Sequence, residues 1–374
     1  MPDLQSPIEM QRPPVVRFGV GQVETLAAWL GASGARRPFV VADKVNAARL
    51  DVLGLTDATL FGEVKPEPDL PNLEAAVAAA KATGADAVVG FGGGSAMDLA
   101  KLVAVLATSE LGLAEISGPN RAPKRQVRLA QVPTTAGTGS EVGTRALVTD
   151  PGTMNKVATE SVEMLADIAV IDPGLTVSVP AMVTAATGVD AMAHCVEAFT
   201  SKRAHPVIDA YALQGIELVG RYLGRAVADG GDLEARAGLA LAAFYGGVCL
   251  GPVNTTAGHA IAYPLGTRHR LAHGVANALI FPHVLAVNAP AVPEKTALVG
   301  RALGFGAEGL QAVLGGAHDF CERLGLDMAL GAHGVPRDDL PASAREAHAI
   351  RRLLDWNPVD LSEADILEIY EAAY

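Results

Sequence analysis

The sequence predicts an α/β N-terminal domain at residues 1–178 and an all-α C-terminal domain at residues 179–374. A chain of 374 residues is long enough for two domains, and a composition with 50% hydrophobic and 19% charged residues is typical of globular proteins with a large interior. Short apolar runs alternate with helical stretches in the first half only. Because this pattern changes after Asp172, we place the domain boundary between Pro173 and Pro180.

In the first half, apolar runs of strand length are separated by Ala-rich stretches that are typical of helices. Because strands that alternate with helices pair in parallel, this order predicts a doubly wound sheet. The expected strands are residues 38–42, 86–91, 127–132 and 167–171, and the expected helices are residues 72–83 and 96–107.

The second half shows no strand pattern from about Ala181 onward, and one helical pattern follows another. Ser362 is a suitable N-cap, because its hydroxyl can accept from the first turn of a helix, where Glu363 and Asp365 favour the helix dipole. With only 5% aromatic residues, the core must pack through small and aliphatic side chains. The expected helices are residues 181–200, 207–228, 234–250, 275–288, 307–324, 343–354 and 362–373.

The charge and the cysteines exclude several kinds of partner and location. The formal net charge is −12 and no basic stripe is present, which argues against nucleic acid and anionic membranes as partners. Three scattered cysteines fit a reducing compartment better than a disulfide framework. The polar N-terminus has no signal-peptide pattern, and no uncharged run reaches the ~20 residues that a bilayer requires. We therefore expect a cytoplasmic protein that acts on a small molecule.

A phosphate-binding turn is predicted at Gly92–Ser95, between an expected strand and an expected helix. Glycines let backbone N–H groups approach a phosphate closely, and a helix N-terminus favours its negative charge. A tight strand-to-helix turn is the alternative interpretation. The hydroxyl-rich segment Pro133–Glu141 also follows a strand and suits phosphate or nicotinamide contacts, with a plain polar loop as its alternative.

Asp43 follows the expected strand 38–42 and therefore precedes the glycines. In the common Rossmann pattern the acidic residue instead comes about 20 residues after the glycines. A carboxylate at such a strand end can hydrogen-bond a ribose 2′-hydroxyl and repel a 2′-phosphate, which favours NAD over NADP. A helix cap at the same position is the alternative.

Four side chains in the second half form a candidate set of metal ligands. Asp190 and His194 are four residues apart on an expected helix, so they lie on one face of it. His259 and His273 supply two further imidazoles, and one carboxylate with three imidazoles suits Fe²⁺, Zn²⁺ or Ni²⁺. Because the chain has nine histidines, a chance pair or a hydrogen-bonded core histidine is the alternative.

Four segments follow one another along the chain: GGGSAMDLAK at 92–101, PTTAGTGSEV at 133–142, DAMAHCVEAFTS at 190–201, and HAIAYPLG with HGVANALIFPHV between 259 and 284. In this order they resemble the iron-containing, metal-dependent alcohol dehydrogenase family, the relatives of lactaldehyde reductase and 1,3-propanediol dehydrogenase. The resemblance implies an N-terminal dinucleotide-binding domain in a dehydroquinate synthase-like fold, NAD as cofactor, a divalent metal (Fe²⁺ before Zn²⁺), and a homo-oligomer.

The same resemblance implies roles for individual residues. The implied metal ligands are Asp190, His194, His259 and His273. The implied cofactor-binding residues are Asp43 at the adenosine ribose, Gly93, Gly94 and Ser95 at the pyrophosphate, Asp98, Thr134, Thr135 and Thr138 along the cofactor, and Lys156.

Two positions depart from the family pattern. Many members carry a second histidine four residues after the third ligand, often assigned to proton relay, and this chain has Tyr263 there. A phenol with a pKa of about 10 is a poor proton carrier at neutral pH. Tyr263 and His269 are therefore the candidate catalytic residues, with water or the ribose hydroxyls as alternatives for the relay. At the second position, Glu67 replaces an Asn that is frequent beside the cofactor.

Together these features predict a metal-dependent oxidoreductase that transfers a hydride between NAD(H) and a small alcohol or aldehyde. Arg268 and Arg270 stand between two ligands, which indicates a substrate with a carboxylate or another anionic group unless they belong to a solvated loop. A hydroxyacid–oxoacid transhydrogenase is a close alternative. A dehydroquinate synthase-like lyase and a non-catalytic nucleotide-binding protein are alternatives of other classes.

Overall fold

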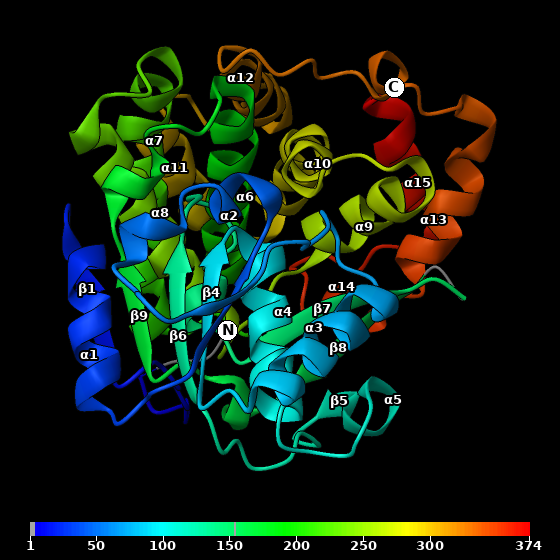
Figure 1. Ribbon diagram of the computed structural model, residues 1–374. Coiled ribbons are helices and arrows are strands. Elements are labelled where there is room, and N and C mark those ends of the chain that lie inside the picture. Colours follow the sequence, from blue (N-terminus) through cyan, green and yellow to red (C-terminus); the bar gives the residue numbers. More distant parts are fainter. Residues whose placement is uncertain (1–3, 153–154) are drawn as a thin grey trace. The chain divides into compact units, whose positions relative to one another are not determined.

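The computed structural model describes residues 4–152 and 155–374, which form two compact units (Figure 1). We call residues 11–135 and 139–177 the α/β unit, and residues 4–10, 136–138 and 178–374 the helical unit. The segment 4–10 and the short loop 136–138 therefore belong with the helices, although both precede the boundary that the sequence pattern indicates.

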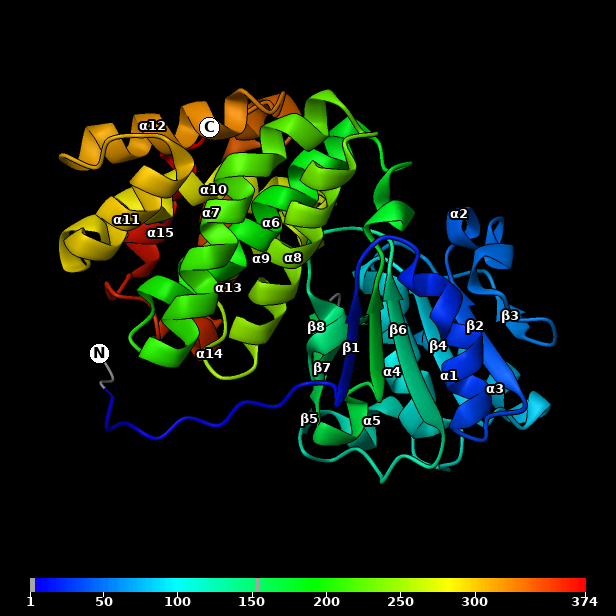
Figure 2. The same cartoon turned by 90° about the vertical axis from the view of Figure 1, so that its left-hand side faces the viewer.

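The α/β unit is built on a six-stranded sheet in which every neighbouring pair is parallel (Figure 2). The strand order is β1 (Val15–Phe18), β9 (Ile168–Ile171), β6 (Arg128–Pro133), β4 (Ala87–Gly92), β2 (Pro38–Ala42) and β3 (Thr59–Phe61). All six residues of β4 are buried, as expected for a central parallel strand whose run of side chains is entirely apolar. The predicted doubly wound sheet is thus confirmed.

Helices bury both faces of this sheet, because alternate strand residues point to opposite sides. Val88 packs in one core with residues of α3 and α4, and Val89 packs in another with residues of α1. The helices are α1 (Leu26–Ala32), α2 (Lys44–Ala47), α3 (Leu70–Thr83), α4 (Gly94–Leu106) and α5 (Leu113–Ile116). A second, three-stranded sheet has the order β5 (Gly118–Pro119), β8 (Asn155–Glu160) and β7 (Arg145–Asp150).

The helical unit contains no strand within residues 178–374, all of which the structure describes. Close packing in its core depends on glycine. A Cβ at Gly188 would lie 2.3 Å from a methyl carbon of Leu223, and one at Gly238 would lie 2.2 Å from the ring of Tyr222. The helices are α6 (Ala181–Thr200), α7 (Pro206–Ala228), α8 (Leu233–Leu250), α9 (Ala257–His269), α10 (His273–Asn288), α11 (Pro293–Leu303), α12 (Leu310–Glu322), α13 (Leu340–His348), α14 (Arg351–Leu354) and α15 (Glu363–Ala372).

Several elements differ from the sequence-based expectation. Helix α9 was not expected, and it contains Pro264, a residue that usually interrupts a helix. The expected helix 343–354 is two helices, α13 and α14, separated at Ala349 and Ile350. Strands β1, β3 and β5 were also not expected, since with four residues or fewer they are too short to show a clear periodicity. Helix α11 and the strands β7 and β8 were not expected either.

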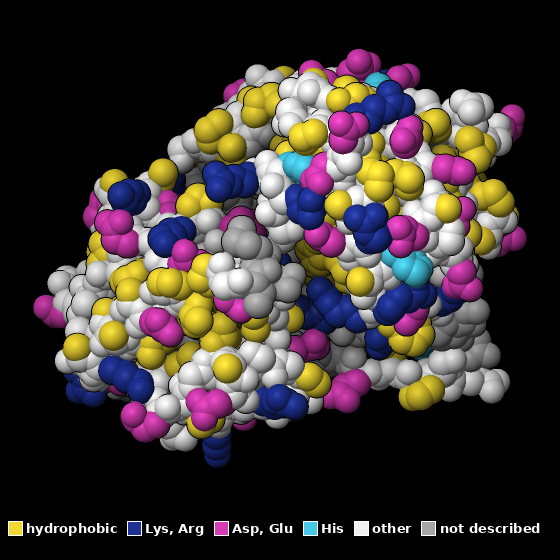
Figure 3. Space-filling model, turned by 90° about the vertical axis from the view of Figure 1, so that its right-hand side faces the viewer, with side chains coloured by type: hydrophobic (Ala, Val, Ile, Leu, Met, Phe, Trp, Pro, Cys, Tyr) yellow, Lys and Arg dark blue, Asp and Glu magenta, His cyan; other side chains and the backbone are white. Residues whose placement is uncertain are grey.

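Two helices are long and apolar enough to cross a membrane by length and composition alone. These are α8 and the segment 273–291, which contains α10. Most residues of both are buried inside the helical unit, so their apolar composition is that of core helices. On the face drawn in Figure 3, acidic and basic side chains are interspersed, without a large area of one sign.

Candidate active site

Three helices of the helical unit bring the four predicted metal ligands together. Asp190 and His194 lie one turn apart on α6, His259 lies in the first turn of α9, and His273 is the first residue of α10. Their ligand atoms all lie within 4.8 Å of one another. Residues from two parts of the chain that are at least 65 positions apart therefore form one cluster, which neither helix periodicity nor spacing alone could establish.

The distances in this cluster fit a tetrahedral metal ion. Oδ1 of Asp190 lies 3.8 Å from Nε2 of His194, 3.5 Å from Nε2 of His259 and 3.5 Å from Nε2 of His273. A tetrahedral ion with bonds of about 2.1 Å keeps its ligand atoms about 3.4 Å apart. One carboxylate and three imidazoles are also a donor set for Fe²⁺ or Zn²⁺. The residues present thus fit the divalent metal that the resemblance implies.

Burial and neighbouring charges together shift the pKa values of the buried ligands. The side chains of Asp190, His194 and His259 are nearly inaccessible, whereas 32% of the His273 side chain is exposed, so solvent reaches the ligands from the side of His273. Burial raises the pKa of Asp190, but the three neighbouring imidazoles outweigh this and hold that pKa well below its usual range. Burial lowers the pKa of His194 and keeps that imidazole neutral, as a metal ligand must be.

Glu197, which the sequence analysis did not single out, orients His259. Its Oε1 lies 2.5 Å from Nδ1 of His259, and its Oε2 accepts from the backbone N–H groups of Thr256 (2.5 Å) and His259 (3.3 Å). A histidine that donates from Nδ1 to a carboxylate presents the lone pair of Nε2 to a metal. Burial lowers the pKa of His259, but Glu197 and Asp190 outweigh this and raise that pKa well above its usual range. The spacing of Glu197 from Asp190 and His194, at i+7 and i+3 on one helix face, is the signal that could have revealed it.

Asn277 is a second polar neighbour of the ligands that sequence reasoning missed. It lies on α10 one turn after His273 and is almost fully buried. Its Nδ2 donates to Oδ1 of Asp190 over 2.7 Å and lies 3.2 Å from Nε2 of both His259 and His273. The spacing of Asn277 from His273, at i+4, places both on one helix face and could have indicated this position.

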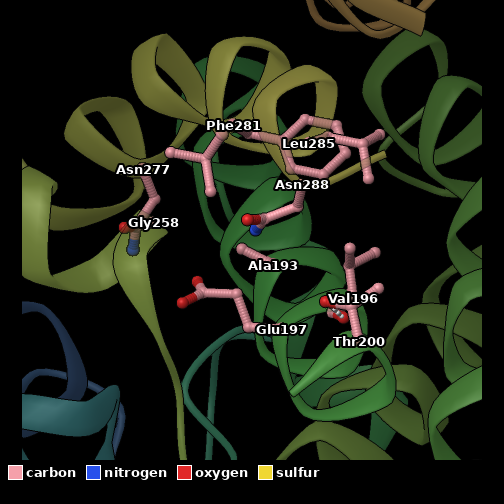
Figure 4. Close-up of a pocket in the computed structure, with 10 residues that line it drawn as sticks. Ala193, Val196, Glu197, Thr200, Gly258, Asn277, Phe281, Leu285 and Asn288 are labelled. Atoms are coloured by element: carbon pink, nitrogen blue, oxygen red, sulfur yellow. Dashed lines mark hydrogen bonds between the residues drawn. The ribbon is translucent and has the colours of Figure 1, made fainter. Parts of the chain in front are cut away.

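A cavity of about 20 Å³ lies next to Glu197 and Asn277, between α6 and α10 (Figure 4). All of its lining residues are buried, and Figure 4 shows Glu197 reaching from α6 and Asn277 from α10. The lining residues are Ala193, Val196, Glu197, Thr200, Gly258, Asn277, Phe281, Val284, Leu285 and Asn288.

The two candidate catalytic residues lie in different surroundings. The ring centroid of Tyr263 is 5.8 Å from that of His273 and 6.3 Å from that of His259, so Tyr263 lines the exposed side of the ligand cluster. His269 instead lies next to Asp339, with Nε2 and Oδ2 3.0 Å apart, but in a geometry that forms no hydrogen bond. Ten helical residues separate His269 from His259, which corresponds to ~15 Å along α9. Sequence reasoning placed His269 beside the ligands because it did not expect this helix.

Arg268 is engaged away from the ligands. Its guanidinium forms ion pairs with Asp339 and with Glu346, the latter over 2.6 Å. These partners lie 71 and 78 residues further along the chain, so the sequence gave no local sign of them. The expectation that Arg268 would pair with an anionic substrate is therefore not supported, because its charge is already neutralised.

The predicted cofactor-binding segments meet at one edge of the sheet in the α/β unit. Strands β2, β4 and β6 are adjacent and parallel, so their carboxyl ends carry Asp43, the turn after Gly92, and Thr134 side by side. Thr134 N donates to Gly92 O over 3.0 Å, and a Cβ at Gly93 would lie 3.2 Å from the hydroxyl of Thr135. The 13-residue helix α4 starts at Gly94. An edge formed by strand ends and a helix N-terminus is a typical nucleotide-phosphate site.

Several of the predicted cofactor residues have contacts of their own. Asp43 caps α2: its Oδ1 accepts from two backbone N–H groups, at Val45 and Asn46, and its Oδ2 accepts from Nδ2 of Asn46. Ser95 accepts from the backbone N–H of Glu67 over 3.3 Å. Lys156 forms an ion pair with Glu67, and burial lowers the pKa of Lys156 to about 8. Thr138 belongs to the helical unit, unlike the other predicted cofactor residues.

Asp98 is held by groups of the α/β unit. Its Oδ1 accepts from the Ser140 hydroxyl over 2.5 Å and lies 3.3 Å from Nζ of Lys101, while its Oδ2 accepts from the backbone N–H of Leu147. Lys101 is fully buried and also donates to Ser140 Oγ. This network connects α4 to the end of the Pro133–Glu141 segment, and it gives Asp98 a structural role within the α/β unit.

Comparisons with known proteins cover nearly the whole chain. Residues 13–173 match the family described as iron-containing alcohol dehydrogenase, and residues 184–374 match the C-terminal part of the Fe-containing alcohol dehydrogenase family. Long-chain-alcohol dehydrogenase 1 of Geobacillus thermodenitrificans (strain NG80-2) is 37% identical over 383 residues, which cover 97% of this chain and 95% of that protein.

Two solved structures are similar over their full length. A crystal structure of 1,3-propanediol oxidoreductase superposes with a TM-score of 0.93 and 31% identity, covering 99% of this chain and 100% of that one. Sulfoacetaldehyde reductase from Bifidobacterium kashiwanohense, in complex with NAD⁺, superposes with a TM-score of 0.89 and 28% identity, covering 98% of this chain and 99% of that one.

Proposed function

Because the chain belongs to the iron-containing alcohol dehydrogenase family, we propose that it uses its buried metal centre and NAD(H) to interconvert a small alcohol and the corresponding aldehyde. The observation that carries this function is the convergence of Asp190, His194, His259 and His273, whose ligand atoms all lie within 4.8 Å of one another. When bound there, a divalent metal supplies the Lewis acidity that polarises an alcohol or carbonyl oxygen.

The chain's own residues prepare this centre. Glu197 accepts a hydrogen bond from Nδ1–H of His259, so that Nε2 keeps its lone pair. Burial of Asp190 keeps water away from its carboxylate and strengthens its interaction with a cation. Tyr263 stands against His273, where it excludes water from the exposed side of the cluster and positions the substrate.

For the cofactor we propose a site at the carboxyl ends of β2, β4 and β6. The residues proposed to contact NAD are Asp43, Gly93, Gly94, Ser95, Asp98, Thr134, Thr135, Thr138 and Lys156. The N-terminus of α4 supports a pyrophosphate beside Gly93 and Gly94. Oδ1 of Asp43 accepts two capping hydrogen bonds and Oδ2 accepts one, from Nδ2 of Asn46, so Oδ2 keeps more capacity to accept a ribose hydroxyl.

We propose that proton transfer at the substrate oxygen passes through Tyr263, bound water or the ribose, because Tyr263 is next to the ligands. His269 lies next to Asp339 and is ~15 Å further along α9 than His259. We also propose a cytoplasmic homo-oligomer, on the basis of the family.

Removal of the metal tests the proposed function directly. The purified protein is treated with a chelator, its metal content is measured, and NADH formation from short-chain alcohols is followed before and after addition of Fe²⁺ or Zn²⁺. We expect activity to disappear with the metal and to return with it, and to be higher with NAD than with NADP. Full activity of the metal-free protein would refute the function, and exchange between a hydroxyacid and an oxoacid without net NADH release would indicate a transhydrogenase.

We further propose that an anionic group on the substrate is favoured, through Arg352 in place of Arg268. The guanidinium of Arg352 lies over the ring of Tyr263, with 5.8 Å between Cζ and the ring centroid, and Tyr263 in turn stacks on the exposed ligand His273. Arg352 and Arg270 are exposed and form no ion pair with any residue in 4–152 or 155–374. The similarity to a sulfoacetaldehyde reductase agrees with such a substrate.

Substitution of Arg352 tests this preference. We expect Arg352→Ala to raise KM roughly tenfold for an aldehyde whose carboxylate or sulfonate is several carbons from the carbonyl, because a charge-assisted hydrogen bond is lost. KM for a neutral aldehyde of equal length should not change. Arg351→Ala is the matched control, since Arg351 already pairs with Asp355. Equal effects of Arg352→Ala on anionic and neutral aldehydes would exclude the preference.

A further inference from the structure

Glu67 lies beside the turn at which we propose that the pyrophosphate binds. Its backbone N–H donates to Oγ of Ser95, in the first turn of α4, over 3.3 Å. The carbonyl of the next residue, Pro68, accepts from the backbone N–H of Thr149 on β7 over 2.8 Å. Glu67 is therefore held between the N-terminus of α4 and the three-stranded sheet, within the α/β unit.

The side chain of Glu67 pairs with a lysine from that sheet. Lys156 lies on β8, opposite Thr149 in the antiparallel register. Nζ of Lys156 forms an ion pair with Oε2 of Glu67, and no other acidic residue in 4–152 or 155–374 pairs with this lysine. Only 20% of the Lys156 side chain is exposed, so water screens its charge incompletely. Glu67 is thus the group that offsets the positive charge of Lys156.

Two other lysines around this turn are paired as well. Lys65 pairs with Asp69 over 2.8 Å, and Lys101 on α4 pairs with Asp98 over 3.3 Å. Backbone N–H groups at the start of α4 can hold a phosphate without an ammonium group. Because the lysines have acidic partners, little net positive charge adds to these contacts. The carboxylate of Glu67 is then a charge of the wrong sign beside a phosphate site.

The backbone at Glu67 is a second, independent indication that this carboxylate is functional. Its φ of 53° lies in the left-handed region, where residues other than glycine are uncommon and where Asn and Asp occur several-fold more often. A neutral Asn would therefore fit this backbone better than a glutamate does. Strained residues of this kind cluster at functional sites, so the negative charge is the feature that needs a reason.

We propose that Glu67 sets the affinity of the protein for the dinucleotide by offsetting the charge of Lys156. An ammonium group has three donors, so Lys156 can contact Glu67 and a phosphate or ribose oxygen together. With Glu67 beside it, Lys156 attracts the phosphates less strongly, and NAD(H) is bound more weakly and released faster than with a neutral residue at position 67. This inference rests on the proposed function, since it requires NAD(H) at the carboxyl ends of β2, β4 and β6.

Binding of the cofactor and its fragments, measured without turnover, tests this role. The full-length protein is titrated with NADH by fluorescence, and with ADP-ribose and adenosine by calorimetry, at about pH 7, below the pKa of Lys156 of about 8. We expect Glu67→Asn and Glu67→Gln to lower the Kd for NADH and for ADP-ribose roughly tenfold, because an opposing charge is removed. The Kd for adenosine, which carries no phosphate, should not change. Dissociation of NADH, followed by stopped flow, should slow by a similar factor.

Substitution of the partner should have the opposite effect. Lys156→Met leaves the carboxylate without its counter-charge and should raise the Kd for ADP-ribose, whereas a purely structural ion pair would make both substitutions weaken binding. Glu160→Gln is the matched control, since Glu160 lies at the other end of β8 and pairs with Arg145 over 2.8 Å. It should leave the Kd for NADH unchanged.

The inference is overturned if Glu67→Asn and Glu67→Gln bind NADH no more tightly than the wild type. It is also overturned if these variants and Lys156→Met shift the Kd for ADP-ribose in the same direction, or if adenosine binding tightens as much as ADP-ribose binding. A wild-type protein that binds neither NADH nor NADPH would overturn the proposed function as well, which separates the two failures.

Discussion

Asp190→Asn is expected to lower kcat/KM by on the order of 10³-fold or more. A bound metal supplies several kcal/mol of transition-state stabilisation, and each 1.36 kcal/mol corresponds to a factor of ten in rate. Oδ1 of Asp190 is the one ligand atom within 3.8 Å of all three histidine Nε2 atoms. It is the only anionic member of the cluster, so its replacement leaves three buried imidazoles without the charge that makes a cation stable among them. Loss of bound metal should accompany the loss of activity.

The measurement pairs metal content with steady-state kinetics, using excess Fe²⁺ or Zn²⁺ to separate weak binding from failed chemistry. Asp209→Asn is a suitable control, since Asp209 is an acidic residue of the same unit that pairs with Lys295 and lies outside the ligand cluster. This control should retain its metal and its kcat/KM. An Asp190→Asn protein that holds one metal per chain at wild-type affinity would show that the carboxylate is not a ligand.

Only some of the metal ligands could be identified from helix geometry in the sequence. Asp190 and His194 could be paired from helix geometry alone, because both stand on one face of α6. His259 and His273 could not be added by geometry, since they belong to two further helices, and α9 is obscured by Pro264. The resemblance to a known family supplied them, through motifs that follow one another in the right order. The structure then shows that the four atoms meet.

Hydrogen-bond and ion-pair partners from distant parts of the chain could not be predicted from the sequence. Glu197 contacts His259, which is 62 residues away, and Asn277 contacts Asp190, which is 87 residues away. Arg268 was expected at the substrate because its ion-pair partners, in and before α13, could not be seen. A buried polar residue on an apolar helix face shows that a partner must exist, but only the packing of helices identifies which one.

The second large effect is expected for Glu197→Gln. Glutamine keeps the shape of glutamate, but one of its two terminal atoms is an NH₂ group, which must face either Nδ1–H of His259 or the N–H of Thr256. A buried donor then faces another donor, at a cost of about 1–3 kcal/mol for each group left unpaired. If the NH₂ group faces His259, the ring moves its proton to Nε2 and loses the lone pair directed at the metal. Metal affinity should therefore fall roughly 10–100-fold, as for other partners of metal-bound histidines.

A purely structural role for Glu197 would reduce stability and leave metal affinity alone, so the two are measured separately. The free energy of unfolding is taken from urea titration of the metal-free protein, and the Kd for Zn²⁺ from chelator competition. Glu217→Gln, which removes an exposed carboxylate from α7, should change neither quantity. A Glu197→Gln protein that is less stable but binds Zn²⁺ normally would mean that His259 keeps its tautomer without the carboxylate. In that case Asn277, the remaining neighbour of His259 Nε2, would be the group that fixes the orientation of the ring.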